Sequence, residues 1–138
     1  MPAATPLYRL VYASTARPGL SDRDITDILD VSANNNNQRF LTGFLVFNGS
    51  AFMQVLEGPV DEVMDIYSRI MADERHSGVV QTGGEIATDR AFPNWDMNYY
   101  RAELSDIAEK REGMVAELLP GSVPEWLREL LIQFATIR

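Results

Sequence analysis

Alternating hydrophobic and polar positions near the start of the chain predict a β-strand over residues 7–14. In this segment Tyr8, Leu10 and Tyr12 fall on one face, and Arg9 is the only charged residue. The pattern therefore places Tyr12 in the interior of a strand, on a largely apolar face.

A helix is predicted after the Arg-Pro-Gly turn at residues 17–19. Ser21 is typical of a helix N-cap, and acidic residues follow in the first turn, where the helix dipole favours negative charge. Positions three and four residues apart then form one stripe, which consists of Ile25, Ile28, Leu29 and Ser32. One further helical turn brings Asn35 and Asn36 onto this stripe, so two amides extend an otherwise buried face.

Residues 42–57 carry the clearest local signal, that of a β-hairpin. Two runs rich in β-forming residues flank Asn48-Gly49, a dipeptide that suits a type I′ turn. In the second run Phe52 and Gln54 share a face with further apolar positions. Gln54 is therefore a lone amide in the middle of an apolar strand.

A second helix is predicted from Pro59, because proline suits the first position of a helix. Arg69 and Asp73 lie four residues apart on this helix and can form an ion pair. Extended segments follow at residues 78–89 and 96–101. The order β-α-β-β-α-β-β predicts an α+β fold of the ferredoxin-like sandwich type, with an about five-stranded mixed sheet and two helices on one face.

The pattern becomes helical after residue 101, and we expect a C-terminal helical pair over residues 102–138 rather than a separate domain. Ser122-x-x-Glu125 has the spacing of a capping box for the second helix of this pair. The apolar positions of the first helix are Ile107, Met114, Val115 and Leu118, and those of the second are Leu127, Leu130, Leu131 and Phe134.

Composition narrows the classes of function. The chain has 138 residues, which is enough for one domain, and 46% of them are apolar. A net charge of −8 makes nucleic acid and anionic membranes poor partners, since both carry negative charge. Without cysteine, and with His76 as the only histidine, the usual thiolate and two-histidine metal sites are excluded. We expect a cytoplasmic protein with no membrane span, no export signal and no metal site.

Four polar residues from four elements converge in this prediction. Strand parity and helical phase allow Tyr12, Asn36, Gln54 and Arg69 all to point into the space between the sheet and its two helices. Three of these groups are neutral and do not titrate near pH 7, so they suit contact with a flat heterocycle better than acid–base hydrolysis. A bound ligand would satisfy them, and so would hydrogen bonds within the protein.

The same residues resemble a known family, the BLUF domains, which are blue-light sensors that use flavin adenine dinucleotide (FAD). The resemblance covers residues 7–101 and rests on five segments: LYRLVYAS, NNNNQRFLTG, FMQVLEG, IYSRIMADERHSG and FPNWDM. It implies that Tyr12 is the key tyrosine, that Gln54 is the switching glutamine, and that Trp95 and Met97 are the semi-conserved pair that relays the signal. It makes residues 1–101 the flavin-binding photosensor domain.

The resemblance also implies where the flavin is bound. The cofactor lies between the two helices, FAD is its expected form, and flavin mononucleotide or riboflavin is expected to substitute. The residues implied to contact it are Tyr12, Ile28, Ser32, Asn35, Asn36, Phe52, Gln54, Arg69, Ile70, Asp73 and His76. Of these, Asn36 falls on the family's flavin-binding asparagine, with Asn35 beside it.

The implied mechanism is photochemical and consumes no substrate, so we do not expect an enzyme. Blue light drives an electron and a proton from Tyr12 to the flavin, with Gln54 as the bridge, and Gln54 then rearranges. The signal is expected to leave through the last strand and the C-terminal helices, toward a separate effector protein. A homodimer or larger homo-oligomer is predicted, with a contact formed by Trp126, Leu127, Leu130 and Phe134.

Two other classes of function compete with this prediction. One is a ferredoxin-like interaction module without a cofactor, whose polar groups satisfy one another. The other is a small enzyme such as an acyl phosphate hydrolase, which would need a cradle of backbone amides for an anion. The short, proline-containing turn at residues 16–19 is not typical of such a cradle.

Overall fold

The computed structural model describes residues 6–28, 30, 40–93 and 98–137. Within these residues five strands form one sheet, in the order β4-β1-β3-β2-β5. The strands are β1 (Leu7–Ala16), β2 (Thr42–Phe47), β3 (Ala51–Gly58), β4 (His76–Ala87) and β5 (Asn98–Arg101). Strands β2 and β5 pair in parallel and the other neighbours pair antiparallel, which confirms the predicted mixed sheet. Five predicted site residues lie outside the described residues: Ser32, Asn35, Asn36, Trp95 and Met97.

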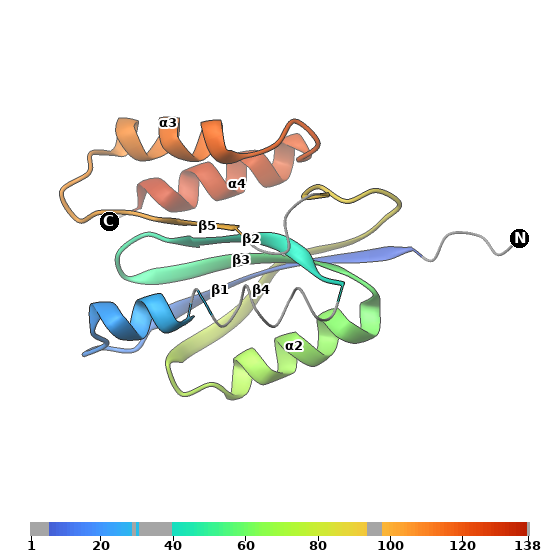
Figure 1. Ribbon diagram of the computed structural model, residues 1–138, viewed down its shortest axis with the longest axis horizontal. Helices are drawn as coiled ribbons and strands as arrows, with labels where there is room; N and C mark the ends of the chain where they lie inside the picture. Colours follow the sequence, from blue (N-terminus) through green and yellow to red (C-terminus); the bar gives the residue numbers. More distant parts are fainter. Residues whose placement is uncertain (1–5, 29, 31–39, 94–97, 138) are drawn as a thin grey trace, which may run out of the picture.

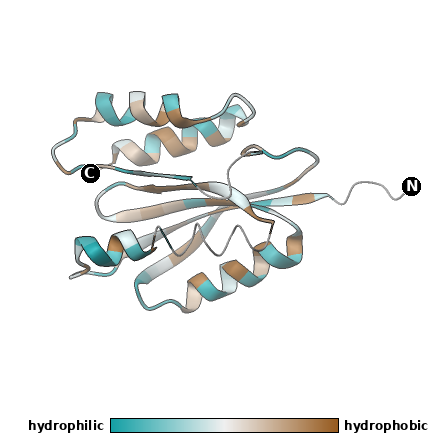
Figure 2. Ribbon diagram, in the orientation of Figure 1, coloured by the Kyte–Doolittle hydropathy of each residue, from teal (hydrophilic) through white to brown (hydrophobic). Residues whose placement is uncertain are grey.

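Helices cover both faces of the sheet (Figure 1). The first helix (residues 22–28) and α2 (Val60–Ala72) lie on one face, and α3 (Ala108–Leu118) and α4 (Glu125–Thr136) lie on the other. Hydrophobic and hydrophilic residues alternate along α2 and α4, as Figure 2 shows, because each helix buries one side against the sheet. The fold is therefore the predicted α+β sandwich with a C-terminal helical pair.

The start of the first helix follows the prediction. The backbone N–H of Asp24 donates to the Ser21 hydroxyl (3.1 Å), and the Ser21 N–H donates to the Asp24 carboxylate (3.0 Å). This reciprocal pair satisfies backbone donors that the first turn of a helix leaves without partners. Helix α2 also begins where expected, immediately after Pro59.

The hairpin turn differs from its prediction by one residue. Asn48 and Ala51 pair through a backbone hydrogen bond (3.1 Å), so the two central residues are Gly49 and Ser50. Gly49 has a φ of +111°, whereas Asn48 and Ser50 keep negative φ. A type I′ turn requires a positive φ at both of its central residues, so the predicted type I′ turn at Asn48-Gly49 is wrong. The Asn48 side chain instead accepts the N–H groups of Ser50 and Ala51.

Strand parity divides the core as the sequence predicted. Leu10, Tyr12 and Leu56 pack against α2, while Phe52 packs with the first helix. On the opposite face Val11, Met53 and Val55 are among the strand residues that pack against the C-terminal helices, and all of these strand residues are buried.

Two details of the C-terminal helical pair differ from those predicted. Pro124 is the N-cap of α4, and the Ser122 hydroxyl does not cap the helix but donates to the Ala91 carbonyl (2.7 Å). In α3 the buried residues are Arg111 and Val115, whereas Ile107 and Met114 are exposed. The helix is held to the sheet by a buried cation as well as by apolar contacts.

Candidate functional site

Tyr12 and Gln54 form the centre of the candidate site. They are directly opposite each other on β1 and β3, and the Tyr12 hydroxyl donates a hydrogen bond to Gln54 Oε1. Each side chain is only 1% exposed. The strand period of two places both on the face that the first helix and α2 cover, so the predicted pair is brought together.

Apolar side chains flank this pair on both sides. Tyr12 belongs to the apolar cluster beneath α2, and Phe52, two positions before Gln54, belongs to the cluster beneath the first helix. Leu45 is the partner of Gln54 on β2. A phenol and an amide in an apolar surrounding can satisfy the polar edge of a flat ring whose faces are apolar.

The Tyr12 phenol holds its proton strongly. Burial raises its pKa far above the ordinary value, and the nearby Tyr67 and Asp73 raise it further. The ring of Tyr67 lies with its centroid 5.7 Å from that of Tyr12. Tyr12 is therefore a neutral hydrogen-bond donor throughout the physiological pH range.

His76 is another titratable group on this face of the sheet. Its Nδ1 shares a hydrogen bond with the Ser14 hydroxyl (2.8 Å), and its ring lies 5.0 Å from the Phe52 ring. Burial lowers the pKa of His76, and the charge of Arg75 lowers it further, while Asp73 acts in the opposite direction. The prediction did not include Ser14, although its parity with Tyr12 places it on the same strand face.

Arg69 and Asp73 do not form the predicted ion pair. Arg69 is exposed and its Nε lies 3.2 Å from the Asp65 carboxylate, one helical turn earlier. Asp73 follows the end of α2, and its carboxylate binds Arg75 (2.8 Å), whose hydrogen bonds hold the pKa of Asp73 below its usual range. The pairing fails because Asp73 has already left the helical path.

The remaining predicted contacts in the described residues differ in burial. Ile28 lies at the end of the first helix and is buried against the sheet, whereas Ile70 is half-buried at the edge of the cluster beneath α2. The structure thus brings Tyr12, Gln54 and Phe52 together on one sheet face.

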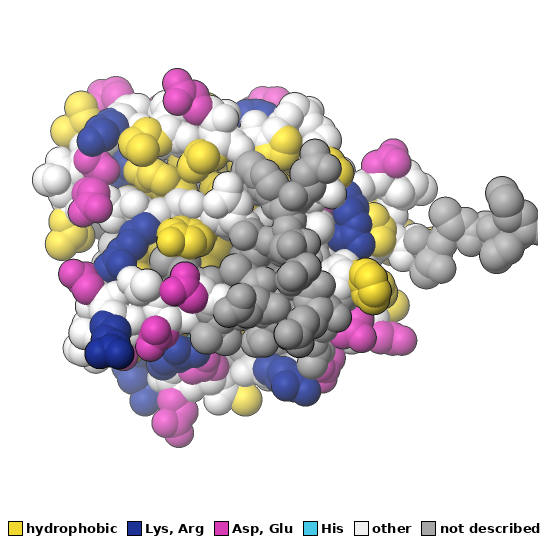
Figure 3. Space-filling model, in the orientation of Figure 1, with side chains coloured by type: hydrophobic (Ala, Val, Ile, Leu, Met, Phe, Trp, Pro, Cys, Tyr) yellow, Lys and Arg dark blue, Asp and Glu magenta, His cyan; other side chains and the backbone are white. Residues whose placement is uncertain are grey.

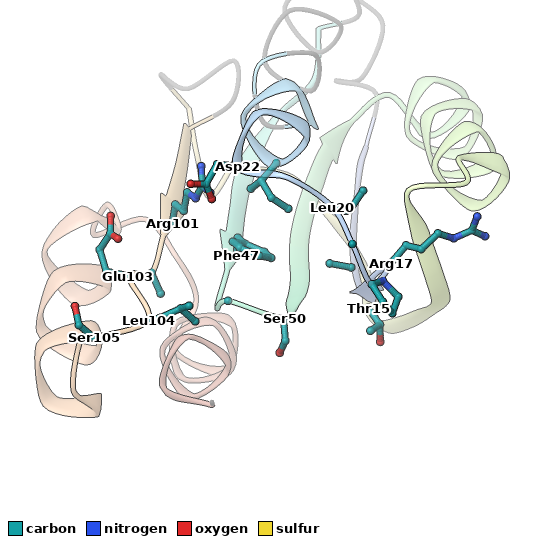
Figure 4. A pocket seen from close by; sticks show the side chains of 16 residues that line it. Thr15, Arg17, Leu20, Asp22, Phe47, Ser50, Arg101, Glu103, Leu104 and Ser105 are labelled. Atoms are coloured by element: carbon teal, nitrogen blue, oxygen red, sulfur yellow. The ribbon is translucent and has the colours of Figure 1, made fainter.

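A groove of about 710 Å³ lies elsewhere, at the hairpin end of the sheet (Figure 4). Arg101 in its wall pairs with Asp22 (2.7 Å), and the guanidinium lies 6.0 Å from the centroid of the Phe47 ring. Neither Tyr12 nor Gln54 lines the groove, so it is separate from the candidate site. Its wall also includes Leu20, Ile25, Ser50 and Leu104.

Charged side chains of both signs lie on the surface of the described residues. Acidic and basic side chains are interspersed over the face seen in Figure 3. No group of three or more potential metal ligands gathers in the described part of the chain. None of the described helices is long and apolar enough to cross a bilayer.

The chain is similar to known proteins in sequence and in fold. A family model described as BLUF, sensors of blue-light using FAD, matches residues 7–98. A blue light- and temperature-regulated antirepressor, BluF of Escherichia coli, is 34% identical over 72% of this chain and 25% of its own length. A photoactivated adenylate cyclase subunit beta of Euglena gracilis is 33% identical over 72% of this chain and 12% of its own length.

A solved structure, the dark state of the BLUF protein BlrB, superposes with a TM-score of 0.72 at 32% identity. The match covers 96% of this chain and 98% of that one. The two curated relatives above are much longer than the chain, which spans a quarter of one and about an eighth of the other. The matched family is one of sensors, which agrees with the prediction of a sensor rather than an enzyme. The chain belongs to the BLUF family, the sensors of blue light that use FAD.

Proposed function

We propose that this chain senses blue light through a rearrangement of the hydrogen bond between Tyr12 and Gln54. The observation that supports the proposal is the buried contact itself, in which a phenol donates to an amide oxygen on an otherwise apolar face. Both groups are neutral, so their hydrogen bonds can be exchanged without moving a charge through a medium of low dielectric.

The flavin is proposed to lie between the first helix and α2, over this pair. When bound, it supplies a ring that absorbs blue light and accepts an electron. FAD is the proposed form, and flavin mononucleotide or riboflavin is expected to substitute. The described residues proposed to hold it are Tyr12, Ile28, Phe52, Gln54, Arg69, Ile70, Asp73 and His76, and the sequence adds Ser32, Asn35 and Asn36.

Tyr12 is the proposed donor of an electron and a proton. Because burial raises its pKa, the phenol keeps its proton in the dark. When Tyr12 loses an electron its proton becomes strongly acidic, and the hydrogen bond to Gln54 Oε1 provides the path along which that proton leaves. The electron and the proton return to Tyr12 afterwards, so the cycle has no net product.

Gln54 is the proposed switch. Its amide has an acceptor end and a donor end, and rotation or tautomerisation exchanges the two without a change in charge. After that exchange, the group facing Tyr12 and the group facing the ligand differ from those of the dark state. We therefore expect a persistent change in hydrogen bonding that relaxes in darkness.

The output is proposed to pass through β5 and the C-terminal helices to a separate effector. The family relatives carry different outputs, since one is named as an antirepressor and another as a cyclase subunit. Leu127 is fully buried within the subunit, so it is not available for the proposed homo-oligomer contact on α4. Trp126, which is 40% exposed, remains available for such a contact together with the half-buried Leu130 and Phe134.

An absorption spectrum tests the function. The protein, purified and incubated with FAD, is measured in the dark and again directly after a blue flash. We expect a flavin spectrum that shifts to longer wavelength and recovers in darkness. A flavin spectrum that only bleaches would contradict the proposed switch, and a protein that takes up no flavin would favour the interaction module without a cofactor.

A further inference from the structure

Glu57 is fully buried on the face of the sheet opposite Gln54, three residues further along the same strand. Its carboxylate accepts hydrogen bonds from Arg9 Nε (3.0 Å) and the Thr42 hydroxyl (2.9 Å). It also accepts the backbone N–H groups of Ala91 (2.9 Å) and Phe92 (2.6 Å). One side chain of β3 therefore binds β1, β2 and the segment that follows β4.

This arrangement fixes the segment after β4 to the strand that carries Gln54. The Arg9 guanidinium, besides binding Glu57, pairs with Glu85 and donates to the Asp89 carbonyl (2.9 Å). A buried carboxylate with several donors is costly to displace, because each donor would lose a charge-assisted hydrogen bond. A displacement of β3 at Glu57 therefore also displaces the backbone of Ala91.

The hydrogen bonds continue into the C-terminal helical pair. The Ala91 carbonyl accepts the Ser122 hydroxyl (2.7 Å), and Ser122 lies in the turn between α3 and α4. Arg128 holds the same turn through the Pro120 carbonyl (3.0 Å). The Glu57 carboxylate, the Ala91 peptide and the Ser122 hydroxyl thus form an unbroken series from β3 to the start of α4.

We propose that this series couples the strand that carries Gln54 to the turn between α3 and α4, with Glu57 and Ser122 as its positioning residues. The light-dependent part of the inference rests on the proposed function, because Gln54 must rearrange for the strand to change. The coupling in the dark does not rest on it. Neither residue touches the Tyr12–Gln54 pair, so both can be changed without altering the switch.

Hydrogen exchange of two backbone amides in this turn measures the coupling. The N–H of Leu119 donates to Val115 and that of Val123 donates to Pro120, so both report opening of the turn. The variants are Ser122→Ala, Glu57→Gln and the double variant, each as the full chain with FAD. Ser105→Ala is the matched control, since Ser105 is an exposed serine in the loop before α3.

In darkness we expect each single variant to raise exchange at these amides about fivefold, the effect of one typical hydrogen bond. The exchange rate in the double variant should be only slightly higher than in the more affected single variant, because both changes interrupt the same series of hydrogen bonds. If the increase in exchange rate in the double variant equals the product of the two single increases, the two residues act independently and the coupling is overturned. If Glu57→Gln does not fold, Thr42→Val takes its place in the comparison, because it removes one donor to Glu57 and keeps a β-branched side chain.

Under blue light the wild type and Ser105→Ala should show a light-dependent change in exchange at Leu119 and Val123. Ser122→Ala should lose that change while its flavin absorption still shifts to longer wavelength. An unaltered light-dependent change in Ser122→Ala would overturn the inference. A wild type without any absorption shift would instead contradict the proposed function, and the dark-state comparison would still decide the coupling.

Discussion

The two faces of the sheet hold their buried polar groups in opposite ways. Beneath the first helix and α2, the buried Tyr12 and Gln54 are both neutral and bound to each other. On the face that α3 and α4 cover, Glu57 is a buried carboxylate that binds Arg9 and two backbone N–H groups. Both arrangements are attached to β3, within three residues of each other.

This difference suits two tasks. Neutral donors and acceptors can exchange partners at little electrostatic cost, whereas a buried charge that loses its partners is heavily destabilising. The face with Tyr12 and Gln54 is therefore suited to change its hydrogen bonds. The face with Glu57 is suited to keep its own bonds and to move as a unit. Substitutions on each face should therefore have different consequences.

Tyr12→Phe removes the electron and proton donor and leaves the ring in place. We expect the variant to bind flavin and to lose the light-induced absorption shift completely. The light-minus-dark absorption spectrum is the measurement. Tyr67→Phe, a change on the neighbouring ring, is the control and should retain the shift. A normal shift in Tyr12→Phe would show that the proton path lies elsewhere.

Gln54→Leu keeps the bulk of the side chain and removes both ends of the amide. We expect flavin binding to persist and the shift to longer wavelength to disappear, because nothing remains that can exchange donor and acceptor. Loss of the acceptor for the Tyr12 hydroxyl should also lower the free energy of unfolding, by about 1–3 kcal/mol. A red shift equal to that of the wild type would be inconsistent with Gln54 as the switch.

Arg111→Met tests whether a buried cation stabilises the contact between the C-terminal helices and the turn of the β2–β3 hairpin. The guanidinium is 1% exposed and donates to the carbonyls of Asn48 (2.9 Å), Ala135 (3.1 Å) and Glu103 (2.9 Å). Because these buried acceptors would lose charge-assisted bonds, we expect the free energy of unfolding to fall by about 3 kcal/mol.

Urea denaturation of the Arg111 variant measures this change. Arg17→Met, a change of the same chemistry on the exposed turn after β1, should alter the free energy of unfolding by less than about 0.5 kcal/mol. Equal unfolding midpoints for the two variants would contradict a structural role for the buried cation.

The free energy of unfolding should depend mildly on pH through His76, which lies on the same face of the sheet as Tyr12. Burial lowers the pKa of His76 in the folded protein. As the pH falls below about 6.5, the unfolded chain therefore takes up a proton on this histidine more readily than the folded protein does. The contribution of His76 to the free energy of unfolding is therefore fully present above about pH 6.5. It decreases as the pH falls, by at most about 1.4 kcal/mol at pH 5.5. Urea midpoints at pH 7.5 and 5.5 measure the loss. His76→Asn should show a smaller loss than the wild type, and an equal loss would contradict the assignment to His76.

The strands and the central pair could be predicted from the sequence, because the strand period of two is strict. Tyr12 and Gln54 needed only the correct face on two strands to meet. The Ser21 cap was equally accessible, since its partner lies three residues away.

Contacts that depend on distant segments were not predictable in this way. Ser122 matched a local capping pattern, but its hydroxyl binds the Ala91 carbonyl across the fold. Arg111 lies in a run of four charged residues, Glu109 to Glu112, and nothing in its spacing indicates that carbonyls from Asn48 and Ala135 surround it. Arg69 had acidic residues four positions away on either side, and periodicity alone did not show that the helix ends before Asp73.

A rearrangement of Gln54 can be observed in a light-minus-dark infrared spectrum of the FAD-loaded protein whose glutamine side-chain carbonyls are labelled with ¹³C. We expect a light-dependent amide band that shifts on labelling in the wild type and is absent from Gln54→Leu. A spectrum without any label-sensitive band, or one in which Gln54→Leu retains that band, would contradict a rearrangement of Gln54.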